Sequence, residues 1–170
     1  MIASREHNGK SLISIIDGKD LGEIKGLYLD LDMRHVAGVF TGTEGLINRK
    51  ALAVSRSDVN VMGIDAWLVS GSDVIHPLEE IPESSLFIPV SDLHGREIQT
   101  EGGTKLCVVD DVLIDNDGHV LGFALGKVFA QGPLAERKAI ARDAITDLGS
   151  REKPMTANLS QAESLSIQTI

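Results

Sequence analysis

The sequence predicts a mainly β protein built from two small β-barrels in tandem, and three observations support this fold class. First, 42% of the 170 residues are hydrophobic but only 4% are aromatic, so a packed core would consist mostly of aliphatic side chains. Second, short apolar runs alternate with turn signals, as they do in barrels and sandwiches of short strands. Third, residues 29–39 resemble residues 113–123, which indicates an internal repeat.

The strands of the first copy are predicted from its apolar runs. Residues 12–16 form such a run, which ends at the turn signal Asp17-Gly18. Residues 22–31 and 35–41 are predicted to pair as a hairpin whose turn lies near residues 32–34. The other predicted strands of this copy are residues 51–54 and 66–69.

The second copy repeats this plan, with predicted strands at residues 106–114, 119–128 and 138–141. A counterpart to the strand at residues 66–69 is hard to find. Either a weak strand lies near residues 155–157, or the second barrel is incomplete at this point and closed in some other way.

The domain boundaries follow from composition. The first barrel is predicted at residues 1–75 and the second at residues 89–153. Residues 76–88 are predicted to be a linker, because residues 76–85 contain two prolines and three glutamates. Residues 154–170 are rich in Ser and Gln and are predicted to be a flexible tail, with a short partner-dependent helix as the alternative.

The first copy resembles a known family. Residues 18–30, followed by Val36-Ala37-Gly38-Val39, are similar to the signature of the PRC-barrel family, and residues 51–54 and 63–69 resemble the end of the same domain. The resemblance implies a six-stranded barrel that docks onto other proteins and is not an enzyme. Two copies with little else resemble small stand-alone bacterial members.

Charge and cysteine content restrict the partners and the compartment. The chain has 16 basic and 25 acidic residues and a formal charge of -9, which repels phosphate backbones and anionic lipid surfaces. We therefore expect no nucleic-acid partner, and no apolar stretch is long enough to predict membrane insertion. Cys107 is the only cysteine, so no internal disulfide can form and a cytoplasmic location is expected.

The hairpin turns of both copies carry acids and a histidine that could hold a divalent metal. These candidate ligands are Asp30, Asp32, His35, Asp115, Asp117 and His119. The competing interpretation, which we favour, is that Asp, Asn and Gly at a hairpin tip simply form the turn.

Trp67, the only tryptophan, is a candidate interface anchor if it is exposed, although core or inter-barrel packing is the preferred interpretation. The chain contains no H-E-x-x-H, G-x-S-x-G or phosphate-binding G-x-x-x-x-G-K motif, so neither a catalytic site nor a cofactor is predicted. The sequence therefore predicts a non-catalytic scaffold that binds a protein partner, with self-association left open. The alternative is a regulator that binds a small ligand or a divalent metal through the Asp/His hairpins.

Overall fold

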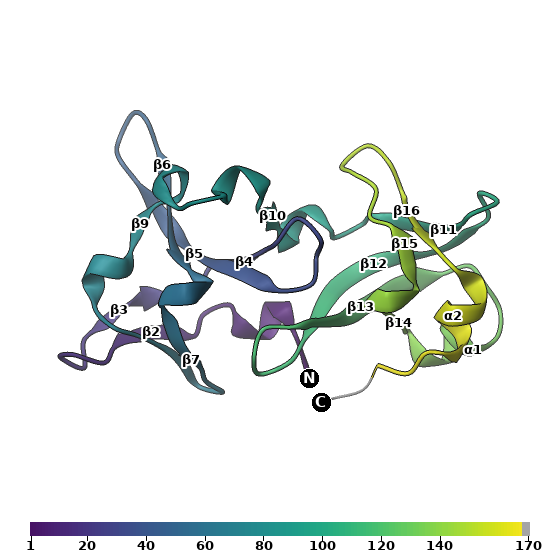
Figure 1. Cartoon of the computed structure of the whole chain (residues 1–170), viewed down its shortest axis with the longest axis horizontal. Coiled ribbons are helices and arrows are strands. Elements are labelled where there is room, and N and C mark those ends of the chain that lie inside the picture. Colours follow the sequence, from purple (N-terminus) through teal and green to yellow (C-terminus); the bar gives the residue numbers. More distant parts are fainter. Residues whose placement is uncertain (168–170) are drawn as a thin grey trace.

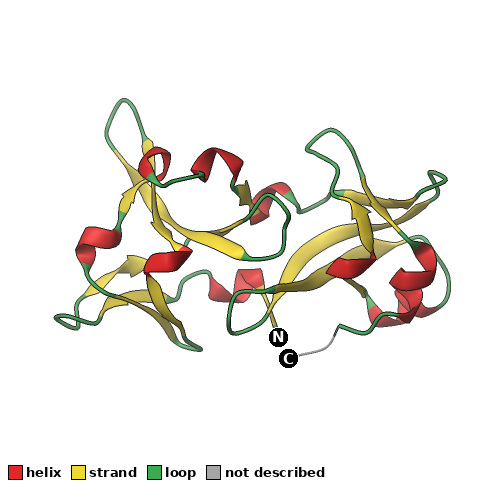
Figure 2. Cartoon of the chain, viewed as in Figure 1, coloured by secondary structure: helices red, strands yellow, loops and turns green. Residues whose placement is uncertain are grey.

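The computed structural model describes residues 1–167 and shows a mainly β chain in two lobes that lie side by side (Figures 1 and 2). The strands of the first half are β1 (Ile2–Ala3), β2 (Ser11–Ser14), β3 (Asp20–Glu23), β4 (Gly26–Leu29), β5 (Val36–Glu44), β6 (Lys50–Ser55), β7 (Val59–Met62), β8 (Ala66–Val69) and β9 (His76–Pro77). Those of the second half are β10 (Ile88–Pro89), β11 (Glu97–Thr100), β12 (Lys105–Ile114), β13 (Val120–Val128), β14 (Ala139–Ala141), β15 (Ile145–Asp147) and β16 (Met155–Ala157). The α-helices are α1 (Pro133–Arg137) and α2 (Leu159–Ser164), and the 3₁₀ turns are η1 (Ser4–His7), η2 (Arg56–Asp58), η3 (Ser72–Val74), η4 (Leu78–Glu80), η5 (Ser84–Leu86), η6 (Val90–Asp92) and η7 (Arg142–Ala144).

The strands form three sheets. The first half contributes a sheet in the order β3-β2-β8-β7 and most of a second sheet in the order β10-β4-β5-β6-β9. The second half forms one sheet in the order β14-β13-β12-β11-β16-β15, with β1 added to β12. The prediction of a mainly β fold is confirmed. Among the described strands, however, hydrogen bonding closes no sheet into a ring: each of the three sheets has two edge strands, namely β3 and β7, β10 and β9, and β14 and β15.

The two halves repeat the same pairings. In the first half, β2 runs antiparallel to β3 and parallel to β8, and in the second half β11 runs antiparallel to β12 and parallel to β16. Trp67 lies opposite Leu12 in one half, and Met155 lies opposite Ile98 in the other. The strand β16 therefore occupies the place of β8, and of the two alternatives for this segment the structure has the strand.

Each half begins with a tight turn that needs a left-handed residue. Gly9 and Gly95 have φ values of 85° and 82°, a region that favours glycine. Gly9 N–H donates to the Ile24 carbonyl at 2.8 Å, and Gly95 N–H donates to the Val109 carbonyl at 2.9 Å. The matching glycines thus turn both chains onto the strands that follow.

The halves also exchange their first strands. β1 pairs with β12 of the second half, with Ile2 opposite Ile114, and β10 pairs with β4 of the first half, with Ile88 opposite Leu29. The predicted boundary between the domains is therefore crossed twice by backbone hydrogen bonding.

The two central hairpins meet at their turns. Val36 N–H donates to the Gly118 carbonyl and Val120 N–H donates to the Arg34 carbonyl, each at 2.8 Å. These reciprocal bonds flank an antiparallel bridge between His35 and His119.

One hydrophobic core runs through both lobes. A single cluster of buried side chains contains Leu12 and Trp67 from the first half and Cys107 and Phe123 from the second half, all of them 0% exposed. Burying apolar surface contributes about 25 cal/mol per Å², so each half is stabilised by surface that the other half covers.

The segment predicted as a linker, residues 76–88, joins the halves but is packed onto the first one. β9 pairs with β6, and Ile81 is buried in a second apolar cluster with Tyr28 and Ala53. Phe87 packs against the same cluster. The prediction weighed the prolines and glutamates of this segment and missed that its apolar residues cover Tyr28.

The segment predicted as a flexible tail, residues 154–170, forms β16 and α2 over residues 155–164. Asn158 caps α2 by accepting a hydrogen bond from Gln161 N–H at 3.0 Å, and Ala162 is buried. The last part of the predicted tail, residues 168–170, lies outside the described residues. Neither described helix is long and apolar enough to cross a membrane.

The shared core predicts that the two halves unfold together. Trp67 lies in the first half and Cys107 in the second, and both are fully buried. We expect Trp67 fluorescence and the reactivity of the Cys107 thiol to report the same denaturant midpoint.

Asp111 lies in β12 of the second half and binds Ser4 and Arg5 of the first half. Asp111→Asn should lower the free energy of unfolding by about 2 kcal/mol and shift the midpoints of both probes by the same amount. Two separate midpoints for the unaltered chain would contradict the shared core.

Candidate functional site

In the first hairpin, Asp30 organises the turn. One oxygen, Oδ1, accepts hydrogen bonds from Arg34 N–H at 2.7 Å and His35 N–H at 3.2 Å. The other, Oδ2, lies 3.0 Å from His35 Nδ1. Asp30 therefore both forms the turn and orients the imidazole.

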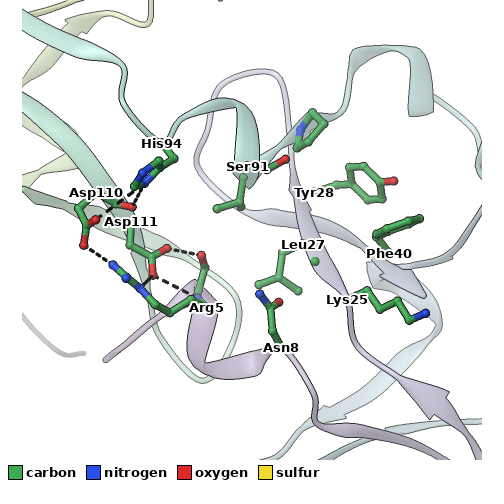
Figure 3. Close-up of a pocket in the computed structure, with 14 residues that line it drawn as sticks. Arg5, Asn8, Lys25, Leu27, Tyr28, Phe40, Ser91, His94, Asp110 and Asp111 are labelled. Carbon is green, nitrogen blue, oxygen red and sulfur yellow. Dashed lines mark hydrogen bonds and ion pairs between the residues drawn. The ribbon is translucent and has the colours of Figure 1, made fainter. Parts of the chain in front are cut away.

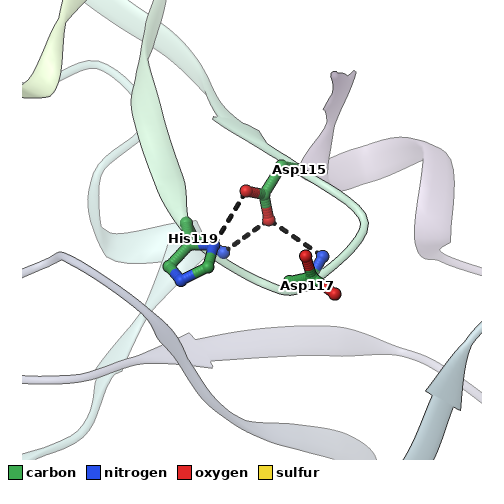
Figure 4. Close-up of side chains that lie close together, drawn as sticks. All are labelled: Asp115, Asp117 and His119. Carbon is green, nitrogen blue, oxygen red and sulfur yellow. Dashed lines mark hydrogen bonds and ion pairs between the residues drawn. The ribbon is translucent and has the colours of Figure 1, made fainter. Parts of the chain in front are cut away.

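The second hairpin repeats this arrangement with one residue fewer. Asp115 Oδ1 accepts hydrogen bonds from Asp117 N–H at 2.9 Å and His119 N–H at 2.8 Å, and Asp115 Oδ2 lies 2.8 Å from His119 Nδ1 (Figure 4). Burial by itself would raise the pKa of Asp115, but the hydrogen bonds from His119 and Asp117 outweigh it and lower the pKa below its ordinary value.

The structure brings five of the six candidate ligands together at the two hairpin turns. The His35 and His119 rings lie with their centroids 5.2 Å apart, and Asp30 and Asp115 hold them from either side. Within the second hairpin, ligand atoms of Asp115, Asp117 and His119 lie within 4.8 Å of one another.

Asp32 is exposed and enters the site only through its backbone. Its carbonyl accepts hydrogen bonds from the buried Arg142, at 3.2 Å from Nε and 2.6 Å from Nη2. Arg142 Nε also donates to the Met33 carbonyl at 3.1 Å. Arg142, which lies in η7 of the second half, thus holds the turn of the first hairpin through backbone carbonyls.

Trp67 is not an interface anchor, because it is 0% exposed and has no surface to offer a partner. Its Nε1–H donates to His7 Nδ1 at 3.0 Å, and the two rings pack edge to face with centroids 5.1 Å apart. The sequence showed one indole in an apolar strand, and the structure places that indole in the core.

The buried carboxylate of Asp111 joins the N-terminus to the second half. It accepts hydrogen bonds from the Ser4 hydroxyl, from Arg5 Nε at 2.7 Å and from Val112 N–H at 2.7 Å. Arg5 also forms an ion pair with Asp110. Burial opposes ionisation of Asp111, but the bonds from Ser4 and Arg5 are stronger in sum and lower its pKa.

A groove with a volume of about 430 Å³ lies at this junction of the two halves (Figure 3). One end contains the network of Arg5, Asp110 and Asp111, and the other contains the aromatic rings of Tyr28 and Phe40. The remaining lining residues are Ser4, Asn8, Lys25, Gly26, Leu27, Pro89, Val90, Ser91 and His94.

The groove combines an apolar floor with a charged rim. Leu27 and Tyr28 are buried beneath it, and Lys25 and Arg5 are exposed at its edge. His94 Nδ1 lies 2.9 Å from the Asp110 carbonyl oxygen. Such a surface can hold an apolar side chain of a partner and orient it by charge.

Sequence reasoning missed this groove because its residues come from five separate segments. Two signals pointed to it: Tyr28 and Phe40 are rare aromatic residues in this chain, and Arg5 precedes a turn glycine that recurs at Gly95.

The His7–Trp67 contact predicts a pH-dependent stability. Burial, assisted by the charge of Lys10, lowers the pKa of His7 from 6.5 to about 4. The unfolded chain therefore binds more protons than the folded chain between these pH values, and the folded state loses stability as the pH falls through them. The loss is about 3 kcal/mol when complete.

His7→Asn keeps an acceptor for the Trp67 indole but cannot titrate. In this variant the denaturant midpoint should therefore no longer fall as the pH is lowered from 6.5 to 4. A slope in this window that persists in the variant would assign the effect to other groups. Asp111 also contributes stability that is lost on acidification, but its pKa is lowered from 3.8, so this loss occurs below the pH window of His7.

Comparison with known proteins adds one finding to this geometry. Residues 87–146 match the family model of the PRC-barrel domain. No curated protein sequence matches the chain. The matched residues include η6, the hairpin of β12 and β13, and η7, and hence the second-half side of both the groove and the histidine pair.

Proposed function

We propose that the protein is a non-catalytic binding module that holds a segment of a partner protein in the groove between its halves. The proposal rests on a comparison of equivalent positions on the two sides of the junction between the halves. On one side these positions hold the ion pair of Arg5 and Asp111, and on the other they hold two small residues that leave the groove open. Both halves line it, so only the assembled chain presents it.

Strand register identifies the counterpart. Gly26 lies opposite Phe40 in β5, just as Asp111 lies opposite Ala124 in β13. The β10–β4 and β1–β12 pairings in the same way place Ser91 where Arg5 stands in the other half. The pair Arg5–Asp111 thus fills one side of the junction, while glycine and serine leave the other side open.

The open side has the surface of a peptide-binding site. Tyr28 and Phe40 both line the groove, and their rings lie with centroids 6.3 Å apart at an angle of 69°. A Cβ built on Gly26 would meet nothing closer than 3.8 Å, so the space beside Phe40 is free. Aromatic floors with a charged rim are typical anchor sites for protein partners.

The Asp111 carboxylate in the groove and the Cys107 thiol in the core both have structural tasks, which supports a non-catalytic role. The Asp111 carboxylate is saturated by Ser4, Arg5 and Val112. Burial raises the pKa of the Cys107 thiol to about 12, so the nucleophilic thiolate is scarce at neutral pH.

The proposal also covers the relation between the two halves and the cellular compartment. We take the first half to be a diverged copy of the domain matched at residues 87–146, which the repeated strand register supports. A protein partner in the cytoplasm, with nucleic acid disfavoured, accords with the charge of -9 and the lone, buried Cys107. Self-association is the rival outcome of the test.

Copying the filled side of the junction into the groove tests the function. The double variant Gly26→Asp/Ser91→Arg should place an ion pair in the open space, because both positions tolerate a side chain. Capture from a native lysate, read by mass spectrometry, should recover a partner with the unaltered chain. The double variant should bind that partner about 30-fold more weakly.

The matched control is Gly102→Asp/Ser72→Arg, which makes the same two substitutions at exposed positions outside the groove. It should bind as the unaltered chain does. Equal capture by both double variants would remove the groove from the function, and recovery of only the chain itself would favour self-association.

A further inference from the structure

The central hairpins place two imidazoles on one face of the junction. His35 and His119 lie opposite each other in an antiparallel bridge, and the flanking backbone bonds join residue 36 to 118 and residue 120 to 34. Residues between such bonds form a non-hydrogen-bonded pair, whose side chains are closest together. The fold therefore fixes the spacing of the rings.

Each ring is also fixed in rotation by its own acid. Nδ1 lies 3.0 Å from Asp30 Oδ2 in His35 and 2.8 Å from Asp115 Oδ2 in His119. A ring that donates its Nδ1 proton to a carboxylate carries its lone pair on Nε2. Carboxylates orient histidines at metal centres in this way.

We propose that His35 and His119 bind one divalent transition-metal ion of the zinc class through their Nε2 atoms, with Asp30 and Asp115 as positioning residues. Two imidazoles on one tetrahedral ion, with metal–nitrogen bonds of about 2.0–2.1 Å, have ring centroids about 5 Å apart. The observed separation is 5.2 Å. The ion would complete its coordination with water or with a donor from a partner.

The proposed ligands are the two histidines and not the acids of one hairpin. Both oxygens of Asp115 already accept hydrogen bonds, from Asp117 and His119 N–H and from the His119 ring. Asp30 is engaged in the same way. The acids therefore support the ligands, and the ligand atoms are the two nitrogens.

The charge around the rings favours a cation. The acids of the two hairpins and of η7 are Asp30, Asp32, Asp115, Asp117 and Asp143, against the three guanidiniums of Arg34, Arg56 and Arg142. Arg34 is paired with Asp143, and Arg142 donates to backbone carbonyls. The local balance is therefore negative by two charges.

The rings are accessible. The side chains of His35 and His119 are 57% and 48% exposed, and both line a groove with a volume of about 640 Å³ between the hairpins and residues 164–167. An ion can therefore enter, and a further ligand can reach it.

Calorimetric titration of the full chain, without a histidine tag, with zinc chloride tests the site. We expect one ion per chain, loss of binding in both His35→Gln and His119→Gln, and unchanged binding in His76→Gln. His76 is the matched control because it is exposed and lies outside the pair. Asp30→Asn should weaken binding about 10- to 100-fold by releasing the ring of His35.

Two readouts on the unaltered chain keep the test independent of how the variants fold. Cobalt(II) should give the visible absorption of a tetrahedral ion, and zinc should shift the proton resonances of two histidine rings together. No binding would overturn the proposal. Binding that survives His35→Gln but not His119→Gln would also overturn it, by moving the ion to the second hairpin alone.

Discussion

Each half of the chain lends its first strand to the other half, and this exchange is the constraint on which the rest of the structure depends. β1 lies on β12 and β10 lies on β4, so neither hairpin has its full complement of strands without the other half. A small domain buries a smaller fraction of its surface on folding than a large one does. The exchange joins two small cores into the single cluster that contains Trp67 and Phe123.

The exchange requires charged groups inside the protein. Asp111 binds Arg5 where β1 enters the second half, and Arg142 binds the Asp32 and Met33 carbonyls where the hairpins meet. Buried charges are costly unless hydrogen bonds compensate them, and both are compensated by several. These polar contacts fix the register between the halves, which apolar packing alone would leave less defined.

The strands were predictable from the sequence because apolar periodicity is a local signal. The contact between the two histidines was not, because aligning residues 29–39 with residues 113–123 places His35 on His119 as equivalent positions but does not indicate that they touch. The same alignment leaves Asp30 and Asp115 one place out of register. The structure explains the mismatch: Asp30 precedes its histidine by five residues and Asp115 by four, and both reach the same Nδ1 atom. The extra residue is accommodated in a turn in which Met33 adopts a φ of 49°.

Other features required contacts between distant segments. Residues 76–88 have the composition of a linker, but composition does not reveal that Ile81 has Tyr28 to cover. Trp67 could be core or interface until its neighbours were known. The groove depends on Gly26 and Ser91, two small residues without any motif, and their role is visible only when strand register aligns them with Asp111 and Arg5.

The comparison of equivalent positions separates what the fold needs from what it does not. Gly9 and Gly95 agree because both turns require a left-handed residue. Gly26 and Asp111 differ although their strands pair alike, so the fold does not demand the open groove. His35 and His119 agree although both are exposed and contribute little to the core. A hollow that packing does not require and an exposed pair that packing does not explain are where binding sites are expected, and both lie on the seam between the halves.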